Sequence, residues 1–280
     1  MREIGVNEII NVVKELCIDS NYNISKDILC AFQEYYKKES SEIGKEVLDQ
    51  LIENSKIASE KQMPICQDTG MAVVFFEIGQ EVRIVDGDLS EAIHEGVRRG
   101  YEEGYLRKSV VRDPFFRENT KDNTPAIIHY DIVKGENIKI TIAPKGFGSE
   151  NMSRIYMLTP SDGMEGAKRV ILETIEAAGG NACPPMVVGV GIGGTFEKAA
   201  ILAKKALLRP VGDVSKIEYV KELEKELLNK ANELGIGPQG LGGNTTVLGV
   251  KVEVFPTHIA GLPVAINISC HVTRHSTRVI

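Results

Sequence analysis

The spacing of apolar residues changes once along the chain, and this change constrains the fold more than any other feature. From residue 6 to about residue 62 the apolar residues recur every three or four positions, as in IINVVKELC, which is the period of an α-helix. After the segment QDTG they form short runs such as MAVVFFEIG and EVRIVDG, which are typical of strands. We therefore expect an α+β fold, with an N-terminal helical subdomain (1–62) packed on a mixed α/β region with several short strands (63–280).

The later segments alternate between both kinds of pattern. Helical periodicity predicts helices near residues 90–106, 164–178, 196–208 and 216–234. AIIHYDIV and IKITIA, separated by the turn KGEN, predict a β-hairpin, and MVVGVGI and the segment after Thr245 predict further strands. Because no linker separates these segments, we expect a single domain over residues 1–280.

Composition and charge limit the partners of the chain. It has 280 residues, of which 42% are hydrophobic and 26% charged, as in ordinary globular proteins. A net charge of −6 argues against nucleic acid as a partner, because binding to phosphates needs an excess of basic residues. No apolar run reaches the roughly 20 residues of a membrane span, and the N-terminus has no signal-peptide pattern. We expect no membrane partner and a cytoplasmic location.

The five cysteines fall into two groups. Cys17 and Cys30 lie in segments of helical periodicity, where a free cysteine usually packs as a small apolar residue. Cys66, Cys183 and Cys270 lie in PICQDTG, GGNACPPM and NISCHVTRH, where neighbouring Pro, Gly and polar residues suit a reactive or metal-binding thiol. Their spacing matches no zinc-finger or ferredoxin pattern. The residues alone therefore leave three alternatives open: shared metal ligation, a lone catalytic thiol at Cys66, or unrelated structural roles.

A glycine motif raises the question of nucleotide binding. Gly189, Gly191 and Gly194 match G-x-G-x-x-G after a strand-like run and before a helix. The dinucleotide fold requires a second parallel strand after that helix, with an acidic residue near its end. Here the helix leads instead into LRPVGD and another helix. We therefore set NAD binding aside and retain only a tight turn whose backbone N–H groups can approach an anion.

Several motifs together resemble a known family. CQDTG, KGFGSENMS, GNACPP, GIGGT, FPTH and SCHVTRH occur in the order seen in class I fumarate hydratases and the related L-tartrate dehydratases, from about residue 50 onward. The chain resembles the α subunit of the two-subunit form. The resemblance implies a [4Fe–4S] cluster held by Cys66, Cys183 and Cys270. Three protein ligands leave one iron open to substrate oxygen, so the cluster acts as a Lewis acid and is sensitive to oxygen.

The implied reaction is the reversible hydration of fumarate to (S)-malate. The alternative within the family is an L(+)-tartrate dehydratase α subunit, which converts tartrate to oxaloacetate. The alternative from another class is a zinc- or thiol-based binding or regulatory protein that uses the same cysteines. Metal analysis separates these classes, because a cluster contains iron and sulfide whereas the rival contains zinc.

The resemblance also assigns roles to other residues. Gln67 and Asp68 contact the substrate, and Asp68 is the candidate for proton transfer, since a carboxylate shielded from water beside an anion holds its proton more tightly. Thr69 and Gly70 shape the turn. Arg107 matches an arginine that binds a substrate carboxylate, which a guanidinium does bidentately. The competing interpretation of Arg107 is a charge at the end of a helix.

The remaining assignments concern two loops and the partners. The segment KGFGSENMS resembles the substrate-binding glycine loop of the family. The resemblance implies that this glycine loop binds the second carboxylate of a small dicarboxylate substrate through Gly146, Ser149, Asn151 and Ser153. His258 matches a histidine that enters the active site of the neighbouring protomer, where it contacts substrate or transfers a proton. His271 and His275 suit hydrogen bonds to cluster sulfur, and the sequence does not choose between them.

Single-chain relatives continue into a second domain that completes the site. Here the sequence ends at Ile280. We therefore expect a separate β subunit, with an α–α dimer inside an (αβ)₂ assembly.

Overall fold

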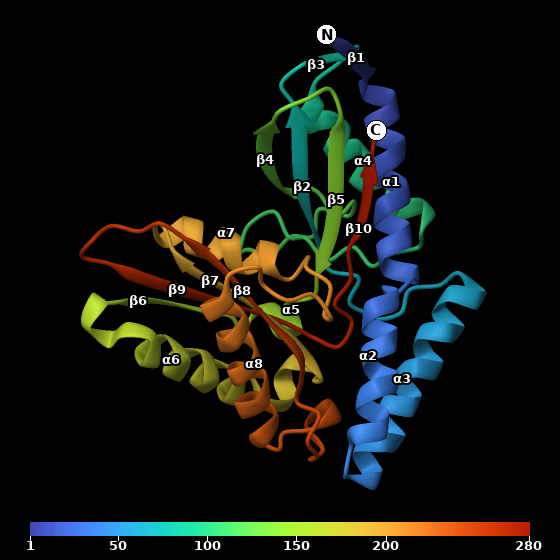
Figure 1. Ribbon diagram of the computed structural model, residues 1–280. Helices are drawn as coiled ribbons and strands as arrows, with labels where there is room; N and C mark the ends of the chain where they lie inside the picture. The colour runs from blue at the N-terminus through green and yellow to red at the C-terminus, as the bar shows by residue number, and fades with distance from the viewer. The chain divides into compact units, whose positions relative to one another are not determined.

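The computed structural model describes residues 1–280 and divides into two compact units. The first unit comprises residues 1–24, 54–146 and 274–280, and the second comprises residues 25–53 and 147–273. Each unit contains a four-stranded mixed sheet with helices packed on it (Figure 1). This confirms the predicted α+β class. None of the helices combines the length and the apolar character that crossing a membrane requires.

The first unit is built around a sheet with the strand order β10-β5-β2-β4. Strand β2 is parallel to β4 and antiparallel to β5, and β10 is antiparallel to β5, while β1 and β3 form a separate parallel pair. The elements are β1 (Arg2–Gly5), α1 (Val6–Tyr22), β2 (Met71–Gly79), β3 (Val82–Val85), α4 (Leu89–Glu103), β4 (Ile127–Val133), β5 (Ile138–Lys145) and β10 (Ser276–Val279).

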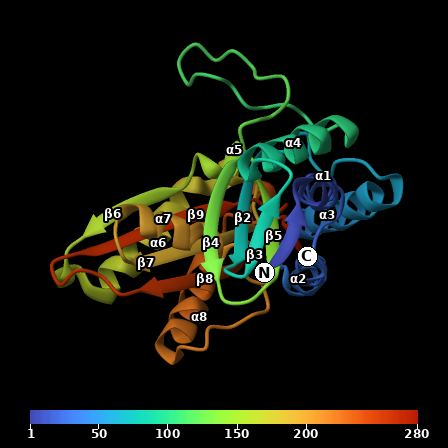
Figure 2. The same cartoon turned by 90° about the horizontal axis from the view of Figure 1, so that it is seen from above.

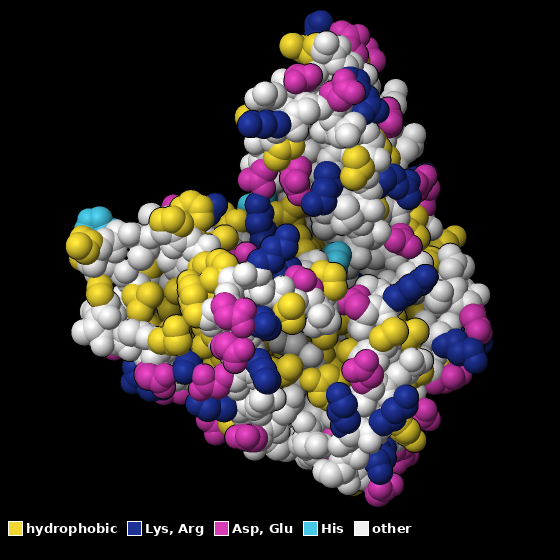
Figure 3. Space-filling model, viewed as in Figure 1, with side chains coloured by type: hydrophobic (Ala, Val, Ile, Leu, Met, Phe, Trp, Pro, Cys, Tyr) yellow, Lys and Arg dark blue, Asp and Glu magenta, His cyan; other side chains and the backbone are white.

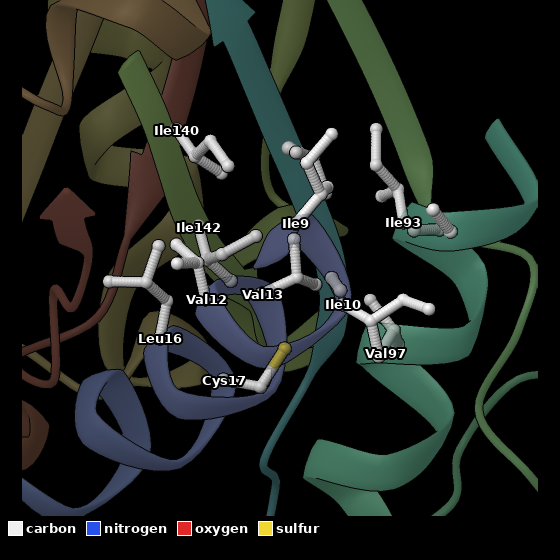
Figure 4. Close-up of a cluster of buried hydrophobic side chains, with 14 of the residues drawn as sticks. Ile9, Ile10, Val12, Val13, Leu16, Cys17, Ile93, Val97, Ile140 and Ile142 are labelled. Atoms are coloured by element: carbon white, nitrogen blue, oxygen red, sulfur yellow. The ribbon is translucent and has the colours of Figure 1, made fainter. Parts of the chain in front are cut away.

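The core of the first unit lies between helices α1 and α4 and the sheet (Figure 4). The predicted apolar stripe of α1, which includes Ile9, Val13 and Leu16, faces Ile93 of α4 and Ile140 of β5. Full burial of each aliphatic side chain contributes about 1.5–3 kcal/mol to folding. Cys17 belongs to this stripe, as predicted, and burial raises the pKa of its thiol to about 12.

The predicted hairpin of β4 and β5 is wrong, because β2 lies between these strands and pairs with both. Strand β2 takes the central position because its residues 72–76 are all buried. Strand β4 instead leaves Ile127, Tyr130 and Ile132 exposed, as befits an edge. The turn between β4 and β5 crosses the end of β2, where the Gly79 N–H donates to the Asn137 carbonyl.

The second unit has a sheet with the strand order β6-β9-β7-β8, in which only β7 and β8 are parallel. Helix α7 packs on one face, and α6 and α8 pack on the other (Figures 1 and 2). The elements are α2 (Lys26–Lys38), the first part of α3 (Glu42–Lys61), α5 (Phe147–Glu150), β6 (Arg154–Leu158), η1 (Pro160–Asp162), α6 (Gly163–Ala178), η2 (Gly179–Ala182), β7 (Met186–Gly193), α7 (Phe196–Ala206), α8 (Glu218–Glu233), η3 (Pro238–Gly240), β8 (Val247–Phe255) and β9 (Leu262–Ser269).

The glycine motif of β7 has a packing role. Successive residues of a strand face opposite sides, so Gly189 and Gly191 both face α7. A Cβ on Gly191 would lie 2.1 Å from the Ala199 carbonyl oxygen, and one on Gly189 would lie 2.1 Å from that of Ala203. Helix α7 therefore approaches the sheet so closely that only glycine fits at these two positions.

Gly191→Ala is expected to lower the free energy of unfolding by about 2–3 kcal/mol, because the added methyl group forces α7 away from the sheet. Gly212→Ala is the matched control, since a Cβ at Gly212 meets no atom within 4 Å. Urea titration of both variants measures the effect. Equal stability of the two variants would contradict the packing role.

The N-terminal region is helical as predicted, but it is shared between the units. Helix α1 belongs to the first unit, whereas α2 and the first part of α3 belong to the second, so residues 1–62 do not form a compact unit of their own. A single catalytic domain over residues 1–280 stays a prediction. The predicted burial of Cys30 is wrong. Ile28, Ala31 and Phe32 form the buried face of α2, and Cys30 projects from the exposed face.

Candidate active site

The turn at residues 66–70 joins α3 to β2 in the first unit and carries three of the candidate residues. Cys66 is half-buried, and its thiol donates to Gln67 Oε1 at 3.3 Å. The Gly70 N–H donates to Asp68 Oδ1 at 3.0 Å, so the carboxylate closes its own turn. Thr69 is buried, and its Oγ1 donates to the Arg107 carbonyl at 3.1 Å. Backbone and side-chain bonds therefore hold Asp68 in place.

Gly70 and the buried Tyr101 fix this turn further. Gly70 has a φ of +77°, and a Cβ there would lie 2.8 Å from the Lys145 backbone, so glycine is required. The Tyr101 hydroxyl donates to the carbonyls of Thr69 and Gly70 at 2.9 and 3.0 Å. Asn123 donates to the Gly70 carbonyl at 3.2 Å. These contacts support the interpretation that Thr69 and Gly70 shape the turn.

Arg107 and Gly146 lie beside the same turn. The Arg107 side chain is exposed, and the residue follows α4, which ends at Glu103, so Arg107 is not in the last turn of the helix. A Cβ on Gly146 would lie 3.1 Å from Asp68 Oδ2. The first unit thus brings together five predicted site residues: Cys66, Gln67, Asp68, Arg107 and Gly146.

Sequence reasoning missed three residues that contact this turn: Tyr101, Asn123 and Arg274. The Arg274 side chain is buried, and its Nη2 donates to the Asp68 carbonyl. The helical periodicity of α4 marks Tyr101 as an inward-facing residue, but nothing in the sequence indicates that its hydroxyl bonds to residues 69 and 70. His275, which follows Arg274, is half-buried, and its role stays open.

In the second unit, hydrogen bonds join the loops of Cys183 and Cys270. The Cys183 carbonyl lies 3.2 Å from the His271 backbone N and 3.0 Å from His271 Nδ1. Gln239, also missed by sequence reasoning, lies 3.1 Å from His271 Nδ1 and donates to the Pro184 carbonyl. Cys183 is exposed and Cys270 half-buried, and neither forms a disulfide. Both cysteines therefore belong to one cluster of hydrogen-bonded loops.

The backbone of Cys183 is strained. Its φ is +51°, in the left-handed region, which costs a non-glycine residue about 1–2 kcal/mol. The bonds from His271 and Gln239 hold the loop in this conformation. Strain of this kind is often found at functional sites. The geometry of Cys183 is therefore consistent with a ligand rather than with a packing residue.

The glycine loop packs beside these two cysteine loops. Helix α5 contains the buried Ser149, and it contacts both η2, which ends just before Cys183, and β9, which ends just before Cys270. Ser153 Oγ accepts from the Asn267 side chain at 2.7 Å and from the Ile268 N–H at 3.0 Å, so it anchors the loop to β9. Asn151 is exposed.

His258 lies at the other end of β9 from Cys270. It is exposed in the turn between β8 and β9, and its Nδ1 accepts from the Ala260 N–H at 3.2 Å. The eight residues of β9 separate this turn from Cys270 by roughly 27 Å at about 3.4 Å per residue. His258 is therefore not brought together with the cysteines of its own second unit. A role in a neighbouring protomer stays a prediction.

The surface around His258 is apolar. A cavity of about 410 Å³ is lined by His258 together with apolar residues that include Met164, Ile192 and Leu262. Figure 3 shows hydrophobic side chains gathered over this part of the second unit.

No group of three or more His, Cys, Asp or Glu side chains forms a metal site in the structure. The three candidate ligands are divided between the units, with Cys66 in the first and Cys183 and Cys270 in the second. Their convergence stays a prediction. None of the three thiols forms a disulfide, and each lies in a loop held by hydrogen bonds.

A long loop follows α4 and projects from the first unit in Figure 2. Near the end of this loop, the Asp122 carboxylate accepts hydrogen bonds from Arg98 and Thr124. The pKa of the Asp122 carboxyl is about 2: burial raises it, but hydrogen bonds from Thr124 and Arg98 outweigh burial and lower it from 3.8. Because the pKa is depressed in the folded state, Asp122 stabilises the protein above about pH 4, and this stabilisation is lost as pH falls towards 2.

Asp122→Asn is expected to destabilise the protein by about 1 kcal/mol at pH 7, since the carboxylate is partly exposed. Urea midpoints measured between pH 7 and pH 2 should show the difference between wild type and variant shrinking below about pH 4. A difference that is constant with pH would contradict the role of the ionised carboxylate.

Comparisons with known proteins agree with the motifs. The chain matches the family described as "Fumarate hydratase (Fumerase)" over residues 10–279. It is 48% identical over 277 residues to "Putative L(+)-tartrate dehydratase subunit alpha" of Methanocaldococcus jannaschii, covering 97% of each chain. It is 32% identical over 277 residues to "L(+)-tartrate dehydratase subunit alpha" of Escherichia coli strain UTI89, covering 98% of this chain and 91% of that one. The chain therefore belongs to the fumarate hydratase family of hydro-lyases.

Proposed function

We propose that this chain is the α subunit of a [4Fe–4S] hydro-lyase that converts L(+)-tartrate to oxaloacetate. One observation carries the choice of substrate: the chain is 48% identical, over 97% of its length, to the protein named "Putative L(+)-tartrate dehydratase subunit alpha". The relative from Escherichia coli carries the same activity in its name. The motifs alone fit tartrate and fumarate equally well as substrates. The names of the relatives favour tartrate.

The residues present fit an iron–sulfur cluster. Cys66, Cys183 and Cys270 form no disulfide and lie outside the apolar core, unlike Cys17, and thiolates are the usual ligands of such clusters. A cationic side chain with two unpaired nitrogens, Arg274, bonds to the turn that holds Cys66, and this fits an anionic group. When bound, a cluster with three protein thiolates supplies an iron that serves as a Lewis acid.

The chain's own residues hold the substrate and move a proton. Removing water from tartrate breaks a C–H bond on one carbon and a C–O bond on the next. A base must remove the proton from the first carbon, the hydroxyl of the second leaves as water once protonated, and the enol that remains tautomerises to oxaloacetate. Asp68 is assigned this proton, because hydrogen bonds fix its carboxylate and its Oδ2 lies against Gly146, where a side chain would crowd it. Gln67 is assigned a hydrogen bond to the substrate.

The two carboxylates of the substrate are assigned to separate groups. Arg107 binds one of them bidentately, and the bond between its carbonyl and Thr69 ties it to the turn that carries Asp68. The loop of Gly146, Ser149, Asn151 and Ser153 binds the other through backbone N–H groups and short polar side chains.

A separate β subunit completes the proposed enzyme. Both relatives are named as α subunits, and this chain aligns with 97% and 91% of their lengths. We place the α chain in an (αβ)₂ assembly with an α–α dimer, in which His258 acts in the neighbouring protomer. The α chain alone is then expected to bind the cluster but to turn substrate over poorly.

Fumarate hydration is the second candidate, because the matching family is described as fumarate hydratase. Anaerobic assays of the reconstituted αβ pair with L(+)-tartrate and with fumarate separate the two. We expect kcat/KM for tartrate to exceed that for fumarate by about tenfold or more, as one recognised hydroxyl allows. The reverse ratio would assign fumarate hydratase. Zinc in place of iron, with no turnover of either substrate, would contradict both.

A further inference from the structure

Arg274 has a buried guanidinium that the protein itself pairs only in part. The residue is 6% exposed, and it follows the candidate ligand Cys270 by four positions. Its Nη2 donates to the Asp68 carbonyl, two residues after the candidate ligand Cys66. The other two nitrogens, Nε and Nη1, are buried and have no hydrogen-bond partner.

Other arginines that are partly buried in this chain pair their guanidinium groups with carboxylates. Arg209 pairs with Glu224 at 2.7 Å, with Asp213 at 3.0 Å and with Glu253 at 3.2 Å. Arg98 pairs with Asp122 at 3.1 Å and also with Glu95. If Arg274 only held the 66–70 turn, one nitrogen that donates to the Asp68 carbonyl would be enough. Arg274 presents two more, on different edges of the planar guanidinium, and each can donate a charge-assisted hydrogen bond to an anion.

An unpaired buried charge is strongly unfavourable, so proteins usually retain one only where a counter-ion binds. We infer that Arg274 binds an anion through Nε or Nη1, beside the turn of Cys66 and Asp68. This inference rests on the proposed function for the identity of the anion. The anion is either the cluster, which is negative when three thiolates hold it, or a carboxylate of the substrate.

Two variants and a control test the inference. Arg274→Met keeps the length of the side chain and removes the charge, whereas Arg274→Lys keeps the charge and removes the planar guanidinium. Arg278→Met is the control, because Arg278 lies nearby on β10, is partly exposed and pairs with Glu15. Each variant is prepared as the complete α chain, without metal and after anaerobic reconstitution with iron and sulfide.

The metal-free chains are compared by urea unfolding. If Arg274 binds an anion, Arg274→Met should unfold at the same or a higher urea concentration than wild type, because a lone buried charge has been removed. If Arg274 only holds the turn, Arg274→Met should unfold at a lower urea concentration with metal and without it, and the inference is overturned.

The reconstituted chains distinguish the two anions. Loss of iron to a chelator about tenfold faster in Arg274→Met, with Arg274→Lys intermediate, identifies the cluster as the anion. Unchanged iron loss with a KM for L(+)-tartrate raised about tenfold in the αβ enzyme identifies the substrate carboxylate. If both quantities match those of the Arg278→Met control, the inference fails. Failure of wild type itself to bind iron would instead contradict the proposed function, and the metal-free comparison would still test anion binding.

Discussion

Replacing Cys66, Cys183 or Cys270 singly by serine is expected to remove most bound iron and to lower turnover of the αβ enzyme by about a thousandfold or more. A Lewis-acidic metal contributes several kcal/mol to stabilising the transition state, and each 1.36 kcal/mol corresponds to a factor of about ten in rate. A serine hydroxyl does not ionise as a thiol does, so the cluster would lose one of its three protein ligands. Iron analysis and steady-state assays of anaerobically prepared variants measure both effects.

Cys30→Ser is the control for these variants. Cys30 is a free and exposed cysteine on α2, so its replacement should leave both iron content and turnover unchanged. Stability of the metal-free chains should be similar in all four variants, because none of these thiols lies in the apolar core. If only Cys66→Ser lost activity while all variants kept their iron, the protein would use a lone catalytic thiol rather than shared metal ligation.

Asp68→Asn is expected to lower kcat by about 10²–10⁴-fold, the usual contribution of a general acid or base. The amide has the shape of the carboxylate, and its oxygen can still accept from the Gly70 N–H, so the turn should keep its conformation. KM and iron content should change little, because the substitution removes proton transfer rather than a ligand. Steady-state kinetics and iron analysis of the αβ enzyme check this separation.

Asp49→Asn provides the matched control. Asp49 is exposed on α3, and its substitution makes the same chemical change away from the site. It should keep the kcat of wild type. A kcat for Asp68→Asn within a few-fold of wild type would move the proton to another group. A parallel loss of iron would make Asp68 part of the metal site instead.

The spacing of apolar residues predicted the helices, because each helix is determined by a pattern within its own segment. The stripe of Ile9, Val13 and Leu16 predicted α1, and the same period predicted α4, α6 and α8, because one face of each helix is buried. Pairing of strands is not a local property. The turn KGEN looks like a hairpin turn, yet the more buried β2 separates β4 from β5. Nothing within residues 126–143 contains that information.

The candidate site divides in the same way. Motifs in loops predicted which residues carry chemistry, and the structure brings Asp68, Arg107 and Gly146 to one turn. Contacts from distant segments were not predictable. The bond from Arg274 to Asp68 spans 206 residues, and the bond from Tyr101 to Thr69 depends on how α4 packs. Burial of an arginine has no sequence signature, since the same residue usually lies at the surface.

For His258, the sequence suggests a role in the site, and the structure places the residue far from Cys270. The motif FPTH identifies it as a candidate, but β9 separates it from Cys270 by about 27 Å. His258 therefore does not reach Cys270 within its own unit, and a role in another protomer stays a prediction. The apolar surface around it would be covered in such an assembly.

The content of iron and acid-labile sulfide in the anaerobically reconstituted chain tests the central claim most directly. The proposed cluster predicts about four iron and about four sulfide per chain in wild type, since a cubane contains four of each. Zinc without sulfide, or a full complement of iron and sulfide that survives replacement of all three of Cys66, Cys183 and Cys270, would contradict it.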